Sequence, residues 1–396
     1  MQPIVHVAGV GMAPFHKPSA APSYLALGAE ALRLALADAG LSYPQVQQAF
    51  AGYVYGDSTA GQRVLYGHGM TGIPIVNVNN NCATGSTALY LARQAIASGT
   101  ADCVLALGFE QMRSGAIASV FEDRPTPFDR FNERTEALVG QPQLPLAIRY
   151  FGGAGLAHMR QYGTRVETFA KIRAKASRHA ARNPLAVFRK VVSEGDVMAS
   201  ETLWPGVMTR LMACPPTCGA AAALLCSADF AARHGLNRQV AIAAQALVTD
   251  REDTFDSDDM RKLVGSGMTR EAARQVYEAA GIGPEDVDVV ELHDCFAHNE
   301  LITYEALGLC AEGDGEKMVV NGDNTYGGKY VINPSGGLLS KGHPLGATGI
   351  AQCVELVQQL RANAGERQVD RALVGLQHNL GLGGACVVTA YRRMDG

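Results

Sequence analysis

The sequence predicts an α/β protein in which helices cover a largely parallel sheet. Apolar residues recur at helical spacing over 24–39 and 268–280, and each segment stops at a glycine, a residue that commonly ends helices. Short apolar runs at 103–109 and 287–292 are typical of strands buried on both faces. Helices that alternate with such strands favour a parallel, helix-covered sheet.

Composition and charge exclude several classes of protein. Of the 396 residues, 47% are hydrophobic and 18% charged, which is normal for a packed globular chain and excludes a disordered or fibrous one. A net charge of −4 supplies no strong field to attract nucleic acid or a membrane surface. No apolar run reaches the ~18 residues that a bilayer crossing needs.

The cysteines and the chain ends suggest a compartment. The nine cysteines are widely spread, which favours free thiols in a reducing cytosol over a disulfide framework. The first residues lack the pattern of a secretory signal, and the chain does not finish on a Ser-Lys-Leu peroxisomal address. We therefore expect a cytoplasmic protein with no membrane span.

The chain repeats itself. Cys82-Ala-Thr-Gly-Ser-Thr-Ala-Leu89 can be laid over His343-Pro-Leu-Gly-Ala-Thr-Gly-Ile350, an offset of 261 positions (343 minus 82), with glycine, threonine and an aliphatic residue matching. Each segment is expected to open a helix, 86–98 or 347–361, that leads through a glycine-containing loop to an apolar strand. The sequence therefore predicts a duplicated α/β unit.

A basic stretch interrupts this alternation within residues 121–204. Nine Lys or Arg and one acid lie between Arg160 and Lys190. Such a run is consistent with a solvated helix face, or with a surface that receives a polyanionic ligand such as a nucleotide phosphate. We expect the segment to be inserted between the first repeat and its closing strand, a common place for ligand contacts.

Cys82 and His343 occupy equivalent places in the two repeats. Cys82 follows a short strand and a polar turn, and the positive end of the next helix would lower the pKa of its thiol. If the halves pack about a pseudo-twofold axis, the two helix starts converge and the two side chains meet. A nucleophile and its base would result, although a buried structural cysteine and an ordinary turn histidine are the simpler interpretations.

A third cluster ends the strand at 287–292. His293 and Cys295 are two residues apart and project to the same side of an extended backbone. The imidazole could hold an oxyanion and the thiol could move a proton. A metal site with Asp294 is the rival, but structural zinc needs four ligands in paired short spacings, and Cys214-Pro-Pro-Thr-Cys218 is the only other close pair. We expect no metal.

The segment 377–385 is rich in glycine. Three glycines in four residues permit close backbone approach and expose amide donors, as an oxyanion hole requires. The spacing is not that of a dinucleotide-binding fingerprint.

Six motifs taken in order resemble those of the thiolases, in particular the thiolase domain of the sterol carrier protein x type. They are Asn79-Asn-Asn-Cys-Ala-Thr-Gly-Ser86, His293-Asp-Cys-Phe296, Gly322-Asp-Asn-Thr-Tyr-Gly-Gly328, Asn333-Pro-Ser-Gly-Gly337, Gly342-His-Pro-Leu-Gly-Ala-Thr-Gly349 and Gln377-His-Asn-Leu-Gly-Leu-Gly-Gly384. The likeness runs nearly from end to end.

The resemblance implies the thiolase fold. Two similar βαβαβαββ halves would form a five-layer α-β-α-β-α sandwich with an inserted loop domain. Residues 1–120 and 205–238 would form the half that carries the nucleophile, 121–204 the loop domain, and 239–396 the second half. The lipid-transfer domain of the animal protein is not expected.

The resemblance also implies roles for four side chains. Cys82 would accept the acyl group and His343 would activate it. His293 would stand where most thiolases have an asparagine that holds the first oxyanion. Cys295 would act as acid and base, since the Cys-x-Gly turn that usually supplies this thiol is absent here.

In place of that turn the chain reads His378-Asn379-Leu380. The backbone amides of Cys82 and Leu380 would form the second oxyanion hole, with His378 and Asn379 beside it. Thr217-Cys218-Gly219 replaces the usual Asp-Gly, and no role for Cys218 follows.

The implied ligand is coenzyme A, as a co-substrate. Basic residues of the loop domain such as Arg160, Lys171 and Arg178 are candidates for its phosphates. No covalently bound cofactor is expected.

The implied activity is that of a 3-oxoacyl-CoA thiolase (acetyl- or propanoyl-CoA C-acyltransferase) in fatty-acid or sterol side-chain β-oxidation. The chain length of the substrate does not follow. A homodimer or dimer of dimers is expected, and a lipid-transfer protein is a further candidate partner. Two alternatives stay open: a thiolase-like carbon–carbon lyase or synthase that needs a partner, and a non-catalytic lipid- or CoA-binding protein.

Overall fold

The sheet of the protein consists of two half-sheets with the same strand order. In the computed structural model, which describes residues 3–115, 117, 120–121, 123–141 and 143–394, the strand order β3-β2-β4-β7-β1 is repeated as β10-β9-β11-β12-β8. The first set is β1 (Val5–Met12), β2 (Gln48–Gly52), β3 (Ile75–Val78), β4 (Cys103–Glu110) and β7 (Gly219–Ser227). The second set is β8 (Val240–Val248), β9 (Val289–Glu291), β10 (Val331–Ile332), β11 (Val374–Gly381) and β12 (Ala385–Arg393). The predicted duplication is confirmed.

The prediction of a largely parallel sheet is wrong. The strand pairs β2–β3, β2–β4, β9–β10 and β9–β11 are parallel, but β4–β7, β7–β1, β11–β12 and β12–β8 are antiparallel. The reason is clearest in the second half, where β11 turns into β12 through residues 382–384, and a hairpin pairs antiparallel. Each half is therefore mixed.

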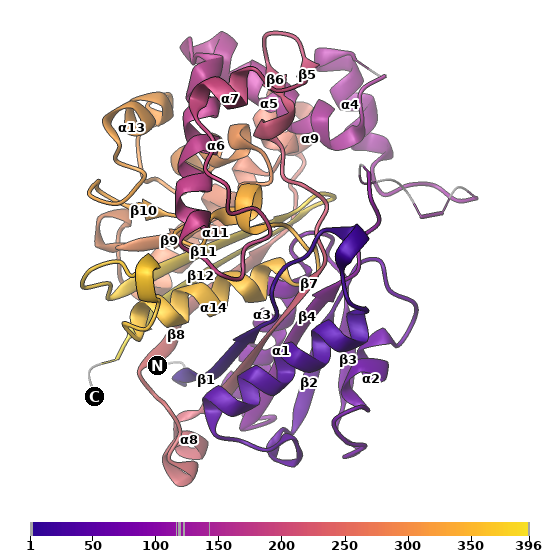
Figure 1. Ribbon diagram of the computed structural model, residues 1–396, viewed down its shortest axis with the longest axis vertical. Helices are drawn as coiled ribbons and strands as arrows, with labels where there is room; N and C mark the ends of the chain where they lie inside the picture. The colour runs from indigo at the N-terminus through magenta and orange to yellow at the C-terminus, as the bar shows by residue number, and fades with distance from the viewer. Residues whose placement is uncertain (1–2, 116, 118–119, 122, 142, 395–396) are drawn as a thin grey trace.

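The two halves join edge to edge and also through a central helix layer. β1 pairs with β8 through only two residue pairs, Val5 with Ile242 and His6 with Ala241. The helices α3 (Thr84–Ala97) and α14 (Thr348–Leu360) pack against each other between the two half-sheets (Figure 1). The outer faces are covered by α1 (Tyr24–Ala39) in the first half and by α11 (Ser266–Ala280) in the second, and α12 (Ala297–Ala306) packs against α11. This is the expected five-layer sandwich.

The helix–helix contact depends on glycine. A Cβ atom added at Gly85 would lie 2.7 Å from the carbonyl oxygen of Gly346, and one added at Gly349 would lie 2.1 Å from Ser86 Oγ. The N-terminal ends of α3 and α14 therefore approach more closely than side chains would allow.

The segment between β4 and β7 forms a helical layer at the magenta end of Figure 1. Buried Tyr150, Phe169 and Trp204 of this segment share a core with Phe296 of the second half. Its elements are α4 (Asp129–Val139), α5 (Leu146–Tyr162), α6 (Val166–Ala181), α7 (Glu194–Met198), β5 (Thr202–Trp204) and β6 (Met208–Thr209). The described residues of the segment therefore share the core of the second half, and the boundaries 121–204 stay a prediction.

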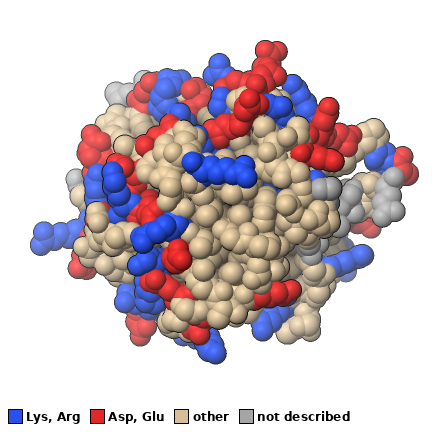
Figure 2. All heavy atoms as spheres, turned by 90° about the horizontal axis from the view of Figure 1, so that it is seen from above, with Lys and Arg blue, Asp and Glu red and all other residues tan. Residues whose placement is uncertain are grey.

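The basic stretch does not form one solvated face. Arg173 and Lys175 are buried, whereas Arg165 and Lys171 form ion pairs of 2.7 and 3.6 Å with Glu316 and Glu194. Figure 2, which looks down on this end of the molecule, shows cationic and anionic side chains intermingled. Ion pairs with acids thus offset part of the local excess of positive charge.

The remaining elements are short. They are α2 (Ala60–Leu65), α8 (Ala228–His234), α9 (Asp253–Asp256), α10 (Met260–Leu263), α13 (Gly315–Asn321), a π-helical turn (Gly337–Lys341) and 3-10 turns at Pro18–Ala20, Tyr43–Gln45, Arg210–Met212, Pro284–Asp286 and Gly365–Arg367. Within the described ranges, no helix combines the length and apolarity of a membrane crossing.

Candidate active site

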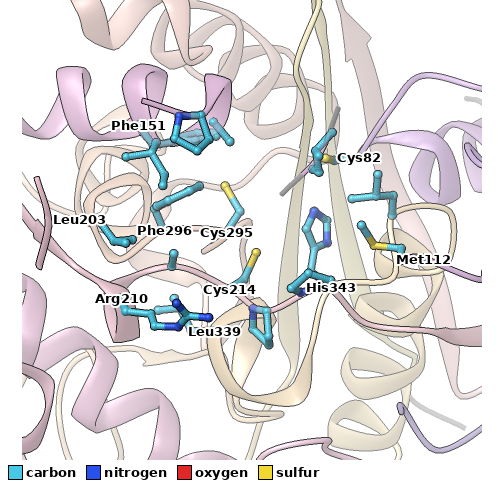
Figure 3. A pocket seen from close by; sticks show the side chains of 18 of the residues that line it. Cys82, Met112, Phe151, Leu203, Arg210, Cys214, Cys295, Phe296, Leu339 and His343 are labelled. Carbon is cyan, nitrogen blue, oxygen red and sulfur yellow. The ribbon is translucent and has the colours of Figure 1, made fainter. Parts of the chain in front are cut away.

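A cavity of about 510 Å³ lies where both halves meet the inserted segment (Figure 3). Its polar lining includes three thiols and two imidazoles, and most of the remaining lining is apolar. The thiols are Cys82, Cys214 and Cys295, the imidazoles are His293 and His343, and the apolar side chains include Phe151, Leu203, Phe296 and Leu339.

Cys82 is held by the turn that joins β3 to α3. Asn81 adopts a left-handed backbone conformation with φ of 50°, which asparagine tolerates better than most residues. The backbone N–H of Asn80 donates to Thr84 Oγ1 at 2.8 Å, which closes the turn over the start of the helix. The Cys82 side chain is buried but lines the cavity.

The prediction of a lowered thiol pKa is wrong for the unliganded protein. Burial, reinforced by the nearby Glu110 carboxylate, raises the pKa of Cys82 to about 12. Desolvation of a thiolate thus outweighs the favourable helix end and the backbone N–H groups of Cys82 and Leu382 that face the sulfur. Cys82 is a neutral thiol at rest and needs a base to become a nucleophile.

His343 has the hydrogen bonds of such a base. Its Nδ1 lies 2.7 Å from Thr348 Oγ1, whose hydroxyl donates to the Pro344 carbonyl oxygen at 2.9 Å. Since that hydroxyl hydrogen is used, Nδ1 must be the protonated nitrogen and Nε2 must carry the lone pair. His343 Nε2 is buried and has no hydrogen-bond partner within the described part of the chain. Burial, together with the charge of Lys341, lowers the pKa of His343 to about 3, so the ring is neutral.

His293 has the opposite tautomer. Gln377 Nε2 donates to Ser86 Oγ at 2.8 Å, so the Ser86 hydroxyl donates onward to Asn379 Oδ1 at 2.8 Å. The Asn379 amide nitrogen then faces His293 Nδ1 at 3.1 Å and can only donate. His293 is left with its proton on Nε2. Burial, followed by the neighbouring imidazoles, lowers its pKa, so this ring is neutral as well.

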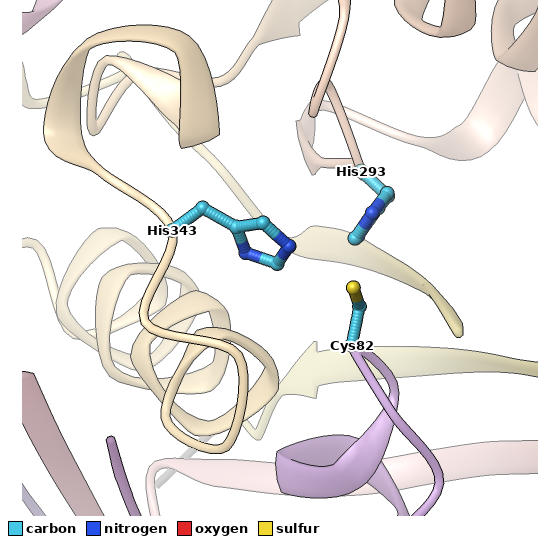
Figure 4. A group of neighbouring side chains, drawn as sticks. All are labelled: Cys82, His293 and His343. Atoms are coloured by element: carbon cyan, nitrogen blue, oxygen red, sulfur yellow. The ribbon is translucent and has the colours of Figure 1, made fainter. Parts of the chain in front are cut away.

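Cys82, His293 and His343 converge (Figure 4). The sulfur and one nitrogen of each ring all lie within 4.8 Å of one another. The two ring centroids are 5.0 Å apart and the rings are nearly perpendicular, at 85°. The repeat had predicted the meeting of Cys82 with His343, and the structure brings His293 to the same point. Three such atoms could also contact a metal ion, but the His293 tautomer offers a hydrogen-bond donor rather than a lone pair.

The rival metal cluster does not assemble. The oxygens of Asp294 accept the backbone N–H groups of Leu338 at 2.7 Å and Leu339 at 3.4 Å. His298 Nε2 bonds to the Val207 carbonyl oxygen at 2.9 Å. Neither side chain joins His293.

Cys295 lines the cavity, and burial raises its pKa well above the ordinary value. It is therefore a neutral thiol that can release a proton to a strong base. Cys214 lines the same cavity, and its backbone N–H donates to the Cys295 carbonyl oxygen at 2.8 Å. Sequence reasoning considered Cys214 only as a zinc ligand, because no local pattern shows that it lies beside Cys295.

The assignment of Leu380 to an oxyanion hole needs correction. Leu380 pairs with Cys386 inside the β11–β12 ladder, and its side chain packs against Gly265. β11 ends at Gly381, so the first residue beyond the strand is Leu382, which lines the cavity and turns its N–H toward Cys82. The backbone N–H that faces the Cys82 sulfur is therefore that of Leu382, two residues beyond the one that the resemblance implied.

His378 and Asn379 support the site from behind. His378 Nδ1 accepts the backbone N–H of His293 at 3.4 Å, and its Nε2 bonds to Thr269 Oγ1 at 2.9 Å. Asn379 sets the His293 tautomer, as described above. Ser86, whose hydroxyl orients Asn379, was missed as a functional residue although it belongs to the cysteine motif.

The basic candidates for CoA do not line the cavity. Arg160 lies in a separate depression with Asp258 and Asp259, Lys171 pairs with Glu194, and Arg178 is exposed. The arginines that line the cavity are Arg173 and Arg210. Periodicity could not have singled out Arg173, because every cation of the basic stretch has the same sequence signal, and Arg210 lies outside that stretch.

Cys218, for which no role was expected, is a core residue. It is fully buried, and its thiol donates to the Met112 carbonyl oxygen at 3.4 Å.

Comparisons with known proteins show the family of the chain. The family models "Thiolase, N-terminal domain" and "Thiolase C-terminal domain-like" match residues 4–125 and 249–390. The chain is 55% identical to sterol carrier protein 2 of Homo sapiens over 392 residues, which is 98% of this chain and 72% of that protein. It is 45% identical to non-specific lipid-transfer protein-like 2 of Caenorhabditis elegans, covering 99% and 96%.

Two solved structures have the same fold. Human mitochondrial 3-ketoacyl-CoA thiolase in complex with CoA superposes with a TM-score of 0.74 at 18% identity, covering 99% of this chain and 98% of that one. An Ltp2–ChsH2(DUF35) aldolase superposes with a TM-score of 0.81 at 21% identity, covering 98% and 97%. The matched family models and the relatives show that the chain belongs to the thiolase family and is an acyltransferase.

Proposed function

We propose that this protein is a 3-oxoacyl-CoA thiolase that transfers the acyl group of its substrate to CoA through Cys82. The observation that carries the proposal is that the Cys82 sulfur and one ring nitrogen of each of His293 and His343 lie within 4.8 Å of one another, on side chains that line a single cavity. Thiolysis needs a nucleophile, a base and an oxyanion donor, and these three groups can supply them.

In the first step, Cys82 attacks the 3-oxo carbon while its proton passes to His343 Nε2. Both groups are neutral at rest, so transfer occurs as the carbon–sulfur bond forms rather than beforehand. The backbone N–H groups of Cys82 and Leu382 face the sulfur and suit the oxyanion that forms on the attacked carbonyl.

In the second step, the C2–C3 bond breaks and its electrons form the enolate of the departing acyl-CoA. The N–H of His293 and the newly protonated His343 donate to the enolate oxygen. Cys295 then gives its proton to C2, which leaves acyl-Cys82, a Cys295 thiolate and a His343 imidazolium.

In the third step, a second CoA thiol loses its proton to the Cys295 thiolate and attacks the acyl-cysteine. The departing Cys82 sulfur recovers the proton from His343. Every group returns to its starting state, and the net reaction transfers the acyl chain from carbon to CoA sulfur.

Coenzyme A would thus act as a co-substrate, as the CoA bound by the human mitochondrial structure suggests. The setting would be β-oxidation of fatty acids or sterol side chains in the cytoplasm, where nine free cysteines stay reduced. A homodimer would form along the free edge of β3, beside which Val76 and Met70 are exposed. A separate lipid-transfer protein would be a suitable partner.

The test is to trap the acyl group. The protein is incubated with a radiolabelled 3-oxoacyl-CoA without free CoA, digested and examined by mass spectrometry. Label on the peptide that contains Cys82 supports the proposal, and label on Cys295 or no label contradicts it. Cys82→Ala should keep acyl-CoA binding and lose turnover, which separates an enzyme from a non-catalytic binding protein. A lyase or synthase would turn over without a labelled cysteine.

A further inference from the structure

A buried arginine lines the apolar cavity. Arg173, on α6, is 5% exposed, and its Nη1 donates to Ser340 Oγ at 2.6 Å. Its Nε has no hydrogen-bond partner among the residues that the structure describes. In the described part of the chain, no carboxylate lies within ion-pair distance of this guanidinium. A buried charge without an opposite charge is costly, so this arrangement needs an explanation.

The acids around Arg173 are engaged elsewhere. Asp294 is close enough to act on Arg173 electrostatically, but its oxygens accept the backbone N–H groups of the π-helical turn. Burial also raises the pKa of Asp294 to about 8, which reduces its negative charge near neutral pH. Glu300 is paired with Lys175. The charge of Arg173 is therefore available to a ligand in the cavity.

We propose that Arg173 binds a carboxylate carried on the acyl chain, so that the preferred substrates are 3-oxoacyl-CoA thioesters with a second acid group. The inference rests on the proposed function, because the cavity that contains Cys82 must receive the acyl chain. A guanidinium presents parallel N–H groups that match a carboxylate, and only an opposite charge compensates a desolvated cation. The apolar walls formed by Phe151, Phe296 and Leu339 would contact the methylene groups between thioester and acid.

The first experiment measures binding without chemistry. Adipyl-CoA and hexanoyl-CoA have six-carbon chains that differ only in the terminal carboxylate. Their dissociation constants are measured by calorimetry on the Cys82→Ala protein, alone and combined with Arg173→Met, Arg173→Lys or Lys190→Met. Lys190 is an exposed cation of the same inserted segment and controls for loss of charge.

We expect adipyl-CoA to bind more tightly than hexanoyl-CoA. Arg173→Met should raise the dissociation constant of adipyl-CoA about tenfold or more and change that of hexanoyl-CoA by no more than about twofold. The reason is that only the complex with the acid loses a hydrogen-bonded charge pair. Arg173→Lys should keep part of the preference, and Lys190→Met all of it. If Arg173→Met lowers the affinity for both ligands equally, Arg173 contacts the CoA part and the proposal is overturned. An unchanged affinity for adipyl-CoA would also overturn it.

The second experiment separates this inference from the proposed function. With Cys82 present, the ratio of kcat/KM for 3-oxoadipyl-CoA over 3-oxohexanoyl-CoA is compared before and after Arg173→Met. A fall of about tenfold supports the inference, and an unchanged ratio overturns it. If neither thioester is cleaved but adipyl-CoA still binds preferentially through Arg173, the proposed function fails while the assignment of the arginine stands.

Discussion

Replacing Asn379 by aspartate tests whether the tautomer of His293 matters to the reaction. The Asn379 amide nitrogen donates to His293 Nδ1 over 3.1 Å, which keeps the single N–H proton of the neutral ring on Nε2. An aspartate of the same shape can only accept, so Nδ1 would take the proton and Nε2 would present a lone pair to the cavity. The N–H donor offered to the enolate would become an acceptor that repels it.

The expected loss follows from the value of one oxyanion donor. Removing such a donor typically lowers kcat by about 10²–10³, or about 2.7–4 kcal/mol of transition-state stabilisation. The Asn379→Asp variant should reach or exceed this range, because it adds repulsion to the loss. Asn379→Ala leaves both tautomers accessible and should lose less, on the order of tenfold.

The assay is steady-state thiolysis of a 3-oxoacyl-CoA, followed by loss of the 3-oxothioester absorbance. Nitrogen-15 NMR of labelled histidines reports directly which nitrogen of His293 carries the proton. Urea unfolding of both variants checks that the fold is intact. The tautomer argument is wrong if the kcat of Asn379→Asp stays within about threefold of that of the unaltered protein. It is also wrong if the kcat of Asn379→Asp is higher than that of Asn379→Ala.

Three further outcomes are expected. Cys295→Ser should slow thiolysis by about 10²-fold or more in steady-state assays, while mass spectrometry should still find Cys82 acylated. The control Cys214→Ser should keep a thiolysis rate within about threefold of the unaltered protein. Burial raises the pKa of Glu110 from 4.5 to about 7, so the folded state binds the extra proton between these values and stability falls as pH rises from 5 to 8. The part due to Glu110 is up to about 3 kcal/mol, and Glu110→Gln should flatten this dependence in urea unfolding at the two pH values. Gly349→Ala should destabilise the protein by about 1–3 kcal/mol in the same assay, because the added Cβ would lie 2.1 Å from Ser86 Oγ; an unchanged midpoint would contradict the close helix approach.

Features that neighbouring residues determine, such as the bounds and caps of helices, could be predicted from local sequence patterns. The helix over 24–39 has the predicted bounds, and Gly40 caps it in the left-handed conformation. The matching motifs around Cys82 and His343 predicted a meeting that the structure shows, because equivalent helix starts converge in a duplicated fold. The proximity of Cys82 and His343 could thus be predicted without coordinates.

Properties set by distant contacts could not be predicted. The direction of the Cys82 pKa depends on burial by three segments, so the helix end alone gave the wrong sign. The tautomer of His293 depends on the bond between Ser86 and Asn379, which are 293 positions apart. The backbone N–H that faces Cys82 belongs to Leu382 rather than to Leu380, because Leu382 lies just beyond the end of β11. A motif does not show where a strand ends.

The neutral resting state of Cys82 has a consequence for the lifetime of the enzyme. In the proposed mechanism the Cys82 proton leaves only during substrate attack. Because peroxides and alkylating agents attack thiolates far faster than thiols, the sulfur would then be spared between turnovers. A cell under oxidative stress would therefore inactivate this acyltransferase slowly when its substrates are scarce.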